Sequence, residues 1–302
     1  MEGKQGLTYE NAIGLLKEYI QSTGKKQTDV ASELGVSGAL VSSFLAGAYK
    51  TPHTMIPKVE ELVRLNEKKK VSSKEPDFAE TSVSRTVFNT ISYAHLRGTV
   101  SVVYGDAGVG KTCAIREYLK QNSLALAITI APTYASITGV NELLAEQLGV
   151  RERVARRLTR EIVLKLKGSG RVLIVDEAQH LTVRALNHLR CISDESGVGI
   201  ALIGNEEVYS KMRGSGQADF AQLFSRIGMR KQVLASRLTA EDIASVFGRY
   251  GLEQEALDML TAVSKTNYGL RGAVNVFINA AAVFDRVDRQ GIVKVMRDMN
   301  IG

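Results

Sequence analysis

The sequence predicts an α/β protein: a parallel five-stranded sheet between helices, with helical domains before and after it in the chain. Short β-rich runs alternate with longer helical periods between about residues 85 and 235, and no strand signal follows residue 236. This alternation is typical of a parallel sheet covered by helices. The 302 residues are 44% hydrophobic and 24% charged, which is the balance of a globular protein.

Shifts in composition along the chain predict four segments. Residues 9–65 are patterned apolar and polar, whereas residues 66–77 are polar, charged and broken by a proline, as linkers are. The strands are expected at about 100–104, 125–130, 171–175, 199–203 and 231–235. The expected domains are therefore an N-terminal helical domain (1–66), a charged linker (67–84), an α/β core (85–235) and a C-terminal helical domain (236–302).

The composition also excludes several classes of protein. No apolar run approaches the ~18 residues that a membrane span needs, and the first residues lack the apolar core of a signal peptide. Cys113 and Cys191 are too few for a disulfide framework or a four-cysteine metal site. We therefore expect a cytoplasmic protein without a membrane partner. The net charge of +7 points mildly toward a polyanionic partner, and a surplus of cations that serves solubility is the alternative.

Residues 27–45 have the pattern of a helix-turn-helix. Ala31 is small enough for two helices to approach, and Gly35 supplies the turn, where a positive φ is needed. Ser37 is placed to cap the second helix. The residues expected on its buried inner face are Val41 and Phe44.

The outer face of that second helix would carry Gly38, Ser42 and Ser43, which are small and uncharged. Strong readout of bases is therefore not expected. The lysines at 50, 58 and 68–70 favour contact with the DNA backbone, with little sequence selectivity. A helical protein-interaction module of the same shape is the alternative.

Residues 105–112 match the phosphate-binding pattern G-x-x-x-x-G-K-[ST] at every fixed position, between an apolar strand and a helical run. Glycines let backbone N–H groups curl around phosphates, and the helix N-terminus adds partial positive charge. Lys111 is expected to reach the β- and γ-phosphates of a nucleotide, and the Thr112 hydroxyl to bind Mg²⁺. Cys113 is expected in a small buried slot behind them. The predicted nucleotide contacts are Gly105, Asp106, Ala107, Gly108, Val109, Gly110, Lys111, Thr112 and Cys113.

The strand expected at 171–175 leads into two acids, Asp176 and Glu177, about 65 residues after the phosphate loop. Asp176 is placed to hold Mg²⁺ through water, and Glu177 to orient or deprotonate the water that attacks the nucleotide. These residues do not separate adenine from guanine, although the chain has no N-K-x-D tetrapeptide for reading guanine.

Residues 151–160 form a basic cluster with five arginines and one acid. At helical spacing, one face would be shared by Arg153, Arg156, Arg157 and Arg160. Such a row of guanidinium groups suits a phosphate backbone better than bases. The alternative is a solvated helix face whose arginines pair with Glu142, Glu146 or Glu161. The predicted DNA contacts are Arg151, Arg153, Arg156, Arg157 and Arg160.

With its phosphate loop, its acid-ended strand and its trailing helices, the chain resembles an AAA+ ATPase. Under that resemblance Asn205 matches the sensor-1 residue that helps to position the attacking water. Arg226 matches the arginine finger that completes a neighbouring subunit's site, with Arg230 as its rival, and Arg271 resembles the sensor-2 arginine of a helical lid. The resemblance thus implies ATP, Mg²⁺ and catalytic roles for Lys111, Asp176, Glu177, Asn205 and Arg226.

The order of the modules narrows the resemblance to the Mu transposition protein B family, and more distantly to TnsC-like transposition regulators. The similarity spans nearly the whole chain, and its more specific segments are 108–112 with 116–118, 176–178 with 180–181, 204–205 with 208–210, and 220–221 with 223–227. The family's basic DNA-contact segment falls on Arg156 and Arg157, with a different spacing.

This resemblance implies an ATP hydrolase of the bacterial host cytoplasm that assembles as a helical filament on double-stranded target DNA. The filament would select the transposition target, largely without sequence preference, and would recruit and activate the transposase. Three alternatives stay open: an ATP-switched helix-turn-helix transcription regulator, a helicase-loader-type protein, and an ATP-binding scaffold.

Overall fold

The structure, a computed structural model, describes residues 7–72, 76–213, 227–284 and 286–301. Contacts divide the chain into two compact units. The first holds residues 1–75 with 281–285, and the second holds residues 76–280 with 286–302. None of the described helices is long and apolar enough to cross a membrane.

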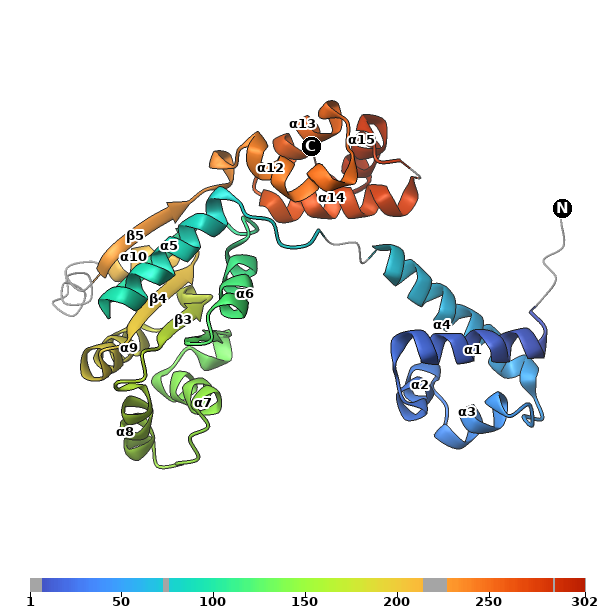
Figure 1. The fold of residues 1–302 in the computed structure, drawn as a ribbon, viewed down its shortest axis with the longest axis horizontal. Helices are drawn as coiled ribbons and strands as arrows, with labels where there is room; N and C mark the ends of the chain where they lie inside the picture. Colours follow the sequence, from blue (N-terminus) through green and yellow to red (C-terminus); the bar gives the residue numbers. More distant parts are fainter. Residues whose placement is uncertain (1–6, 73–75, 214–226, 285, 302) are drawn as a thin grey trace. The chain divides into compact units, whose positions relative to one another are not determined.

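The N-terminal unit is a group of four helices around one apolar core (Figure 1). The helices are α1 (Tyr9–Thr23), α2 (Gln27–Leu34), α3 (Gly38–Leu45) and α4 (Pro52–Ser72). Leu16 of α1, Val41 and Phe44 of α3, and Val59 of α4 are all fully buried in that core. The two predicted inner-face residues of α3 therefore hold the helices together.

The turn between α2 and α3 forms as the sequence predicts. Gly35 adopts a left-handed conformation with φ of 63°, and its N–H donates to the carbonyl groups of Ala31 and Ser32. The Ser37 hydroxyl caps α3 by accepting the N–H of Leu40 at 3.4 Å. The local prediction of two helices, a glycine turn and a serine cap is confirmed.

The stretch expected to be a linker, residues 67–84, is helical at both ends. Helix α4 continues to Ser72, and helix α5 (Ser82–Arg97) begins at Ser82. A run of Lys and Glu residues is compatible with a helix, because their straight side chains lose little freedom there. Polar composition alone therefore does not predict the backbone conformation of this stretch.

The second unit contains the predicted five-stranded parallel sheet, with strand order β2-β3-β4-β1-β5. The strands are β1 (Val100–Gly105), β2 (Ala125–Thr129), β3 (Val172–Asp176), β4 (Gly199–Gly204) and β5 (Ile227–Val233). The helices that flank them are α5, α6 (Lys111–Gln121), α7 (Ile137–Leu148), α8 (Ala155–Leu166), α9 (Val183–Ser196) and α10 (Glu206–Arg213). Short 3₁₀ turns occupy Pro132–Tyr134 (η1) and Ala178–His180 (η2).

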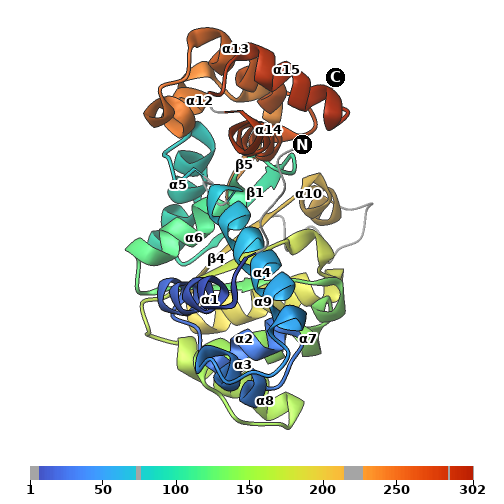
Figure 2. The ribbon, with the colours of Figure 1, turned by 90° about the vertical axis from the view of Figure 1, so that its right-hand side faces the viewer.

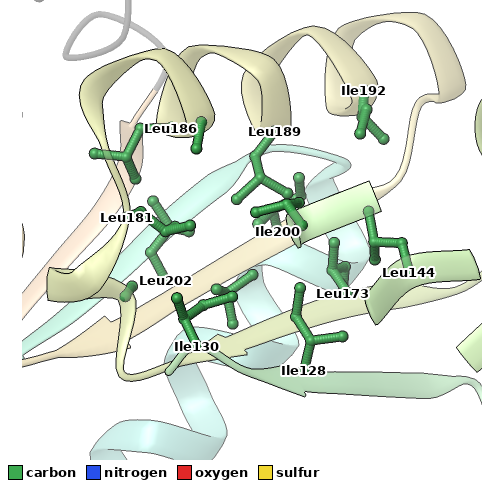
Figure 3. Packing of buried hydrophobic residues seen from close by; sticks show 14 of the residues in the cluster. Ile128, Ile130, Leu144, Leu173, Leu181, Leu186, Leu189, Ile192, Ile200 and Leu202 are labelled. Atoms are coloured by element: carbon green, nitrogen blue, oxygen red, sulfur yellow. The ribbon is translucent and has the colours of Figure 1, made fainter. Parts of the chain in front are cut away.

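Two apolar cores lie on the opposite faces of this sheet. On one face, α7, α8 and α9 pack against residues such as Ile128, Leu173 and Ile200 (Figure 3). On the other face, α5 and α6 pack against Val103 and Ile203. Because both faces are covered, β3 and β4 are buried along their whole length, as the uninterrupted apolar runs predict.

The fifth strand begins four residues before the predicted 231–235 and ends two residues earlier. It is the edge strand next to β1, and most of its residues are half-buried or exposed. An edge strand carries polar side chains that a search for apolar runs does not detect. The expectation of an apolar strand was therefore displaced toward Val233 and Leu234.

Helices alone follow β5 in the described residues, as predicted. They are η3 (Ala235–Arg237), α12 (Ala240–Phe247), η4 (Gly248–Tyr250), α13 (Gln254–Ser264), α14 (Gly269–Val283) and α15 (Arg289–Asp298). The four α-helices lie together (Figure 2). Phe247 of α12 and Phe277 of α14 meet in their core, with ring centroids 5.1 Å apart.

Candidate nucleotide site and basic surface

The phosphate loop connects β1 to α6, and its backbone conformation requires glycine at its start and again in its middle. Gly105 has φ of 142°, and a Cβ there would lie 1.8 Å from the Val233 carbonyl oxygen. Gly108 has φ of 74°, and a Cβ there would lie 2.8 Å from the Tyr268 carbonyl oxygen. The loop is therefore enclosed by β5 on one side and by the C-terminal helices on the other.

The loop presents a series of backbone donors without protein acceptors. No backbone N–H from Ala107 to Cys113 donates to another residue in the part of the chain that the structure describes. These groups include the first N–H groups of α6, where the helix dipole is positive. The Lys111 ammonium lies over the same loop and donates to the Gly105 and Asp106 carbonyl oxygens at 3.1 and 2.6 Å. The cradle therefore fits the phosphates of a nucleotide.

Thr112 and Asp176 come together at the end of β3. The Thr112 hydroxyl donates to Asp176 Oδ2 at 2.8 Å, and Asp176 is 3% exposed. Burial raises the pKa of Asp176, although hydrogen bonds from Thr112 and from the Glu177 N–H oppose that effect. Burial also lowers the pKa of Lys111, against the opposing field of the nearby carboxylates. A hydroxyl oxygen beside a buried carboxylate fits one side of an Mg²⁺ ion, whose other ligands would come from phosphates and water.

Glu177 stands at the same end of β3 in an unusual backbone conformation, with φ of 55°. Its N–H donates to Asp176 Oδ1 at 3.0 Å, and its carboxylate accepts a hydrogen bond from the Gln179 side chain. Gln179 also accepts the N–H of Asn205 on its Oε1 at 3.2 Å. The structure thus brings together Asp176, Glu177 and Asn205 as predicted candidates, and adds Gln179 between them.

Sequence reasoning gave Gln179 no role. A polar residue two positions after the acids was the available signal, but the contact depends on β4 lying beside β3. The Asn205 side chain is also engaged, since its Oδ1 accepts the Glu207 N–H at 2.9 Å at the start of α10. Its amide nitrogen therefore remains the group that could face a nucleotide.

Of the three arginines predicted to act on the nucleotide, one lies beside the phosphate loop, one lies on the edge strand, and one lies outside the described residues. Arg271 starts α14 beside the phosphate loop, where its backbone N–H donates to the Gly108 carbonyl oxygen at 2.9 Å, and its side chain is exposed. Arg230 is exposed on the edge strand β5. Arg226 lies outside the described residues.

One predicted nucleotide contact has a different environment from the one expected. Cys113 is exposed, not placed in a buried slot. It lies on the first turn of α6, while the face of that helix that packs on the sheet carries Ala114, Ile115 and Tyr118. Core packing therefore does not explain this cysteine.

The five arginines of the basic cluster are all exposed, but they do not share one helix face. Helix α8 begins at Ala155, so Arg151 and Arg153 precede it, contrary to the expectation that includes Arg153 in the helix. The Glu152 carboxylate holds this irregular turn by accepting the N–H groups of Arg153 and Val154, each at 2.8 Å. The helix carries only the other three arginines of the cluster.

The predicted alternative for this cluster was a set of ion pairs with nearby acids. Within the described ranges, none of the five arginines forms an ion pair with Glu142, Glu146 or Glu161. A shallow hollow of about 740 Å³ adjoins the cluster, and its lining combines Arg151, Arg153 and Lys165 with two glutamates. The region therefore presents a cationic surface whose arginines are not neutralised by direct pairing.

Comparison with known proteins places this site in context. The AAA domain family matches residues 95–212. Cdc6p from Pyrobaculum aerophilum is similar in fold with a TM-score of 0.51 at 13% identity, over 70% of this chain and 63% of that chain. Domain III of the replication initiation protein DnaA from Thermotoga maritima has a TM-score of 0.50 at 18% identity, over 74% of this chain and 94% of that chain. These likenesses concern the fold alone.

Similarity to curated proteins extends over most of the chain. The Mu-like prophage FluMu DNA transposition protein B of Haemophilus influenzae is 35% identical over 270 residues, which cover 86% of this chain and 92% of that protein. The ATP-dependent target DNA activator B of Escherichia phage Mu is 28% identical over 298 residues, covering 95% of this chain and 94% of that protein. The AAA family match includes the phosphate loop and the acids after β3, and the similarity to these relatives covers most of both chains, so this chain belongs to the Mu-like DNA transposition protein B family and carries an AAA domain.

Proposed function

We propose that this protein is an ATP-hydrolysing activator of target DNA in transposition. The observation that carries the proposal is the joint presence of a complete phosphate-loop site and similarity over most of the chain to proteins named DNA transposition protein B and ATP-dependent target DNA activator B. In its ATP-bound form the protein assembles as a filament on double-stranded DNA, selects the target, and recruits and activates a transposase.

The nucleotide chemistry is assigned to the residues at the ends of β1, β3 and β4. The free N–H groups of the loop and Lys111 bind the phosphates. Thr112 and Asp176 would hold Mg²⁺, which would supply positive charge beside those phosphates. Glu177 orients a water or accepts its proton. Asn205 helps to position that water, and Arg271 approaches from the helical lid.

Assembly of subunits is linked to ATP, because an arginine of a neighbouring subunit would complete each ATP site. An arginine supplied in trans stabilises the charge that develops on the γ-phosphate, and can raise the rate by roughly 10³–10⁵. Arg226 is our candidate for that residue, with Arg230 on the exposed edge strand as the alternative. Binding of ATP therefore favours association of subunits, and association in turn favours binding of ATP, because two coupled binding events strengthen each other equally.

DNA binding is assigned to the basic cluster of residues 151–160, with the N-terminal helices as a second contact. Unpaired, exposed guanidinium groups suit the phosphate backbone and not particular bases. Weak contacts of this kind gain strength when many linked subunits bind one duplex. We therefore expect the affinity for duplex DNA to increase with the length of the duplex and to depend little on its sequence.

Electron microscopy in negative stain tests the proposal directly. The protein is imaged on random-sequence duplex DNA with ATP, with ADP and without nucleotide. Continuous filaments that require ATP are expected. Discrete particles at one locus, or binding that requires a particular sequence, would contradict the proposal and favour the transcription-regulator alternative.

The variant Glu177→Gln tests the role of hydrolysis. It keeps the size of the side chain but removes the carboxylate that handles the water, so complexes on DNA should form with ATP and then persist. Their lifetime can be measured by challenge with excess unlabelled duplex. If lifetimes match those of the unaltered protein while ATP turnover is abolished, hydrolysis is not what releases DNA, and the scaffold alternative gains support.

A further inference from the structure

We propose that Gln179 is a positioning residue for ATP hydrolysis: its side-chain amide fixes the Glu177 carboxylate and connects it to the end of β4 and to α10. The inference rests on the proposed ATPase function and deepens it. Gln179 lies in the 3₁₀ turn η2, two residues after Glu177, and is only 7% exposed.

Both ends of the Gln179 amide are engaged. Its Nε2 donates to Glu177 Oε2, and its Oε1 accepts the backbone N–H of Asn205 at 3.2 Å. Its own main-chain carbonyl oxygen accepts a hydrogen bond from the Lys211 ammonium. A single buried residue therefore contacts the candidate water-handling carboxylate, the residue that follows β4, and a side chain of α10.

The end of β4 is shaped to receive this amide. A Cβ on Gly204 would lie 2.3 Å from Gln179 Oε1 and 2.5 Å from a methyl carbon of Val208. No larger residue than glycine fits there without displacing one of these side chains. The Gln179 amide thus lies against the end of β4 and close to Val208 of α10, where only glycine leaves room for it.

Only an amide of this length satisfies the arrangement. The group must donate to an anionic carboxylate and accept from a backbone N–H at the same time. Asparagine lacks one methylene, and an ionised glutamate has no donor. The support is important because Glu177 has φ of 55°, a conformation that non-glycine residues keep only when their surroundings hold them there.

Helix α10 is connected to the same set of bonds. The Asn205 side chain accepts the N–H of Glu207 at 2.9 Å, and Lys211 reaches the Gln179 carbonyl group from one turn further along. A shift of α10 would therefore alter the orientation of the amide and, through it, of the Glu177 carboxylate. Misplacement by about 1 Å can lower a rate roughly 10²-fold.

The test compares ATP turnover by full-length variants on saturating duplex DNA. Gln179→Leu removes the donor and the acceptor, whereas Gln179→Glu keeps the acceptor for Asn205 but removes the donor to Glu177. We expect kcat to fall roughly 10- to 100-fold in both variants, with ATP affinity within about threefold of the unaltered protein. The matched control is Gln254→Leu, which removes an exposed amide–carboxylate bond to Asp258 on α13, and no change in kcat is expected.

Two readouts separate positioning from simple loss of structure. In single-turnover assays on the Glu177→Gln background, Gln179→Leu should cause no further loss, because both changes act through one carboxylate. The second readout is the split between kcat, which should fall in both Gln179 variants, and ATP affinity, which should stay within about threefold of the unaltered protein. If leucine prevents folding, Gln179→Glu alone carries the test.

Three results would overturn the inference. One is unchanged kcat in both Gln179 variants while Glu177→Gln is inactive. Another is an independent, multiplicative loss on the Glu177→Gln background. The third is absence of ATP hydrolysis in the unaltered protein, which would contradict the proposed function as well and is thereby distinguished from the first two.

Discussion

Glycines at three sites in the core show how closely single residues are matched to their surroundings. A Cβ on Gly199 would lie 2.0 Å from the Ala94 carbonyl oxygen, so β4 passes the C-terminal turn of α5 in direct backbone contact. Gly105 and Gly204 end the adjacent strands β1 and β4, and both have close neighbours of this kind. The candidate site therefore depends on residues that have no side chain at all.

Gly204→Ala is expected to lower the free energy of unfolding by about 1–3 kcal/mol, because the added methyl group overpacks the slot of Gln179. Chemical denaturation with a fluorescence or circular dichroism readout measures the change. Gly248→Ala is the matched control, since its Cβ meets nothing within 4 Å and its backbone is helical. That control should be neutral or stabilising by up to about 1 kcal/mol. Equal effects of the two changes would contradict the overpacking explanation.

At the scale of elements, one carboxylate joins the starts of two helices. Asp242 completes the N-terminal capping box of α12 with Thr239, and its Oδ1 also accepts the Ser82 N–H at 2.6 Å at the start of α5. Burial alone would raise the pKa of Asp242, but hydrogen bonds from Ser82 and Thr239 outweigh that effect and hold the pKa below its usual value. This residue therefore fastens the C-terminal helices to the α/β core.

Asp242→Asn should lower the free energy of unfolding at pH 7 by about 1–3 kcal/mol, since it removes a charge-assisted cap shared by two helices. The folded-state pKa is depressed, so the contribution is present above the unfolded value of about 3.9 and disappears as the pH falls through the folded value. The cost of the substitution should therefore shrink at about pH 3. Glu241→Gln, in the same helical turn, is the control. A cost that is the same at both pH values would show that the charge is not responsible.

A second polar contact set joins α7, α8 and α9 beneath the basic cluster. The Asn141 side chain donates to Thr159 Oγ1 at 2.9 Å and bonds His188 Nε2 through its Oδ1 at 2.8 Å. Asn141 is 3% exposed, and Thr159 lies on the helix that carries Arg156 and Arg160. The position of the arginine-bearing helix is thus set partly by hydrogen bonds and not by apolar packing alone.

Asn141→Leu should lower the free energy of unfolding by about 2–4 kcal/mol, because it places an apolar side chain at a buried polar position and leaves the half-buried Thr159 and His188 without this partner. Asn279→Leu, at an exposed position of α14, should change it by less than about 0.5 kcal/mol. Burial lowers the pKa of His188, so the unfolded chain takes up a proton first and stability should decrease as the pH falls below about 6.5. Denaturation at pH 8 and pH 5.5 measures this, and a pH dependence unaltered in His188→Asn would exclude His188 as its source.

At the scale of the whole molecule, the net charge of +7 is less informative than where the unpaired cations lie. Arg286 and Arg289 near the C-terminus approach Glu253 and Glu255 at 2.7 and 3.8 Å. The arginines of the 151–160 cluster have no such acidic partners among the described residues. Removal of the same charge can therefore be compared at two sites with different surroundings.

The double variant Arg156→Ala with Arg157→Ala is expected to weaken binding to duplex DNA by about tenfold or more in low salt, because fewer phosphates are neutralised. The slope of log K against log salt should become shallower by about 0.9 for each phosphate that a subunit no longer neutralises. Arg286→Ala with Arg289→Ala removes the same charge and serves as the control. Anisotropy titrations with ATP on duplexes of two unrelated sequences measure both slopes. Equal effects of the two double variants would assign the binding to net charge and not to the cluster.

Local patterns in the chain were enough to predict the phosphate loop, the acids after β3, the glycine turn between α2 and α3, and the helical character of the C-terminal region. Each depends on residues within about one element of each other, where backbone conformation and capping act directly. Local patterns do not determine the order of the strands in the sheet, because that order depends on how the helices cover both faces of the sheet. The start of the edge strand β5 was not predicted, because its polar residues do not form an apolar run. The start of α8 at Ala155 was not predicted either, because helical spacing of the arginines included Arg153.

The contacts that complete the site join residues far apart in the chain. Gln179 meets Asn205 because β4 pairs with β3, Asp242 reaches Ser82 across 160 positions, and Arg271 meets the phosphate loop through Gly108. Such contacts depend on packing between elements, which local periodicity does not encode, and their entropic cost is met only when the whole core forms. The chemical groups of this protein are thus readable in its sequence, whereas their mutual positions arise only when the sheet and its helices assemble.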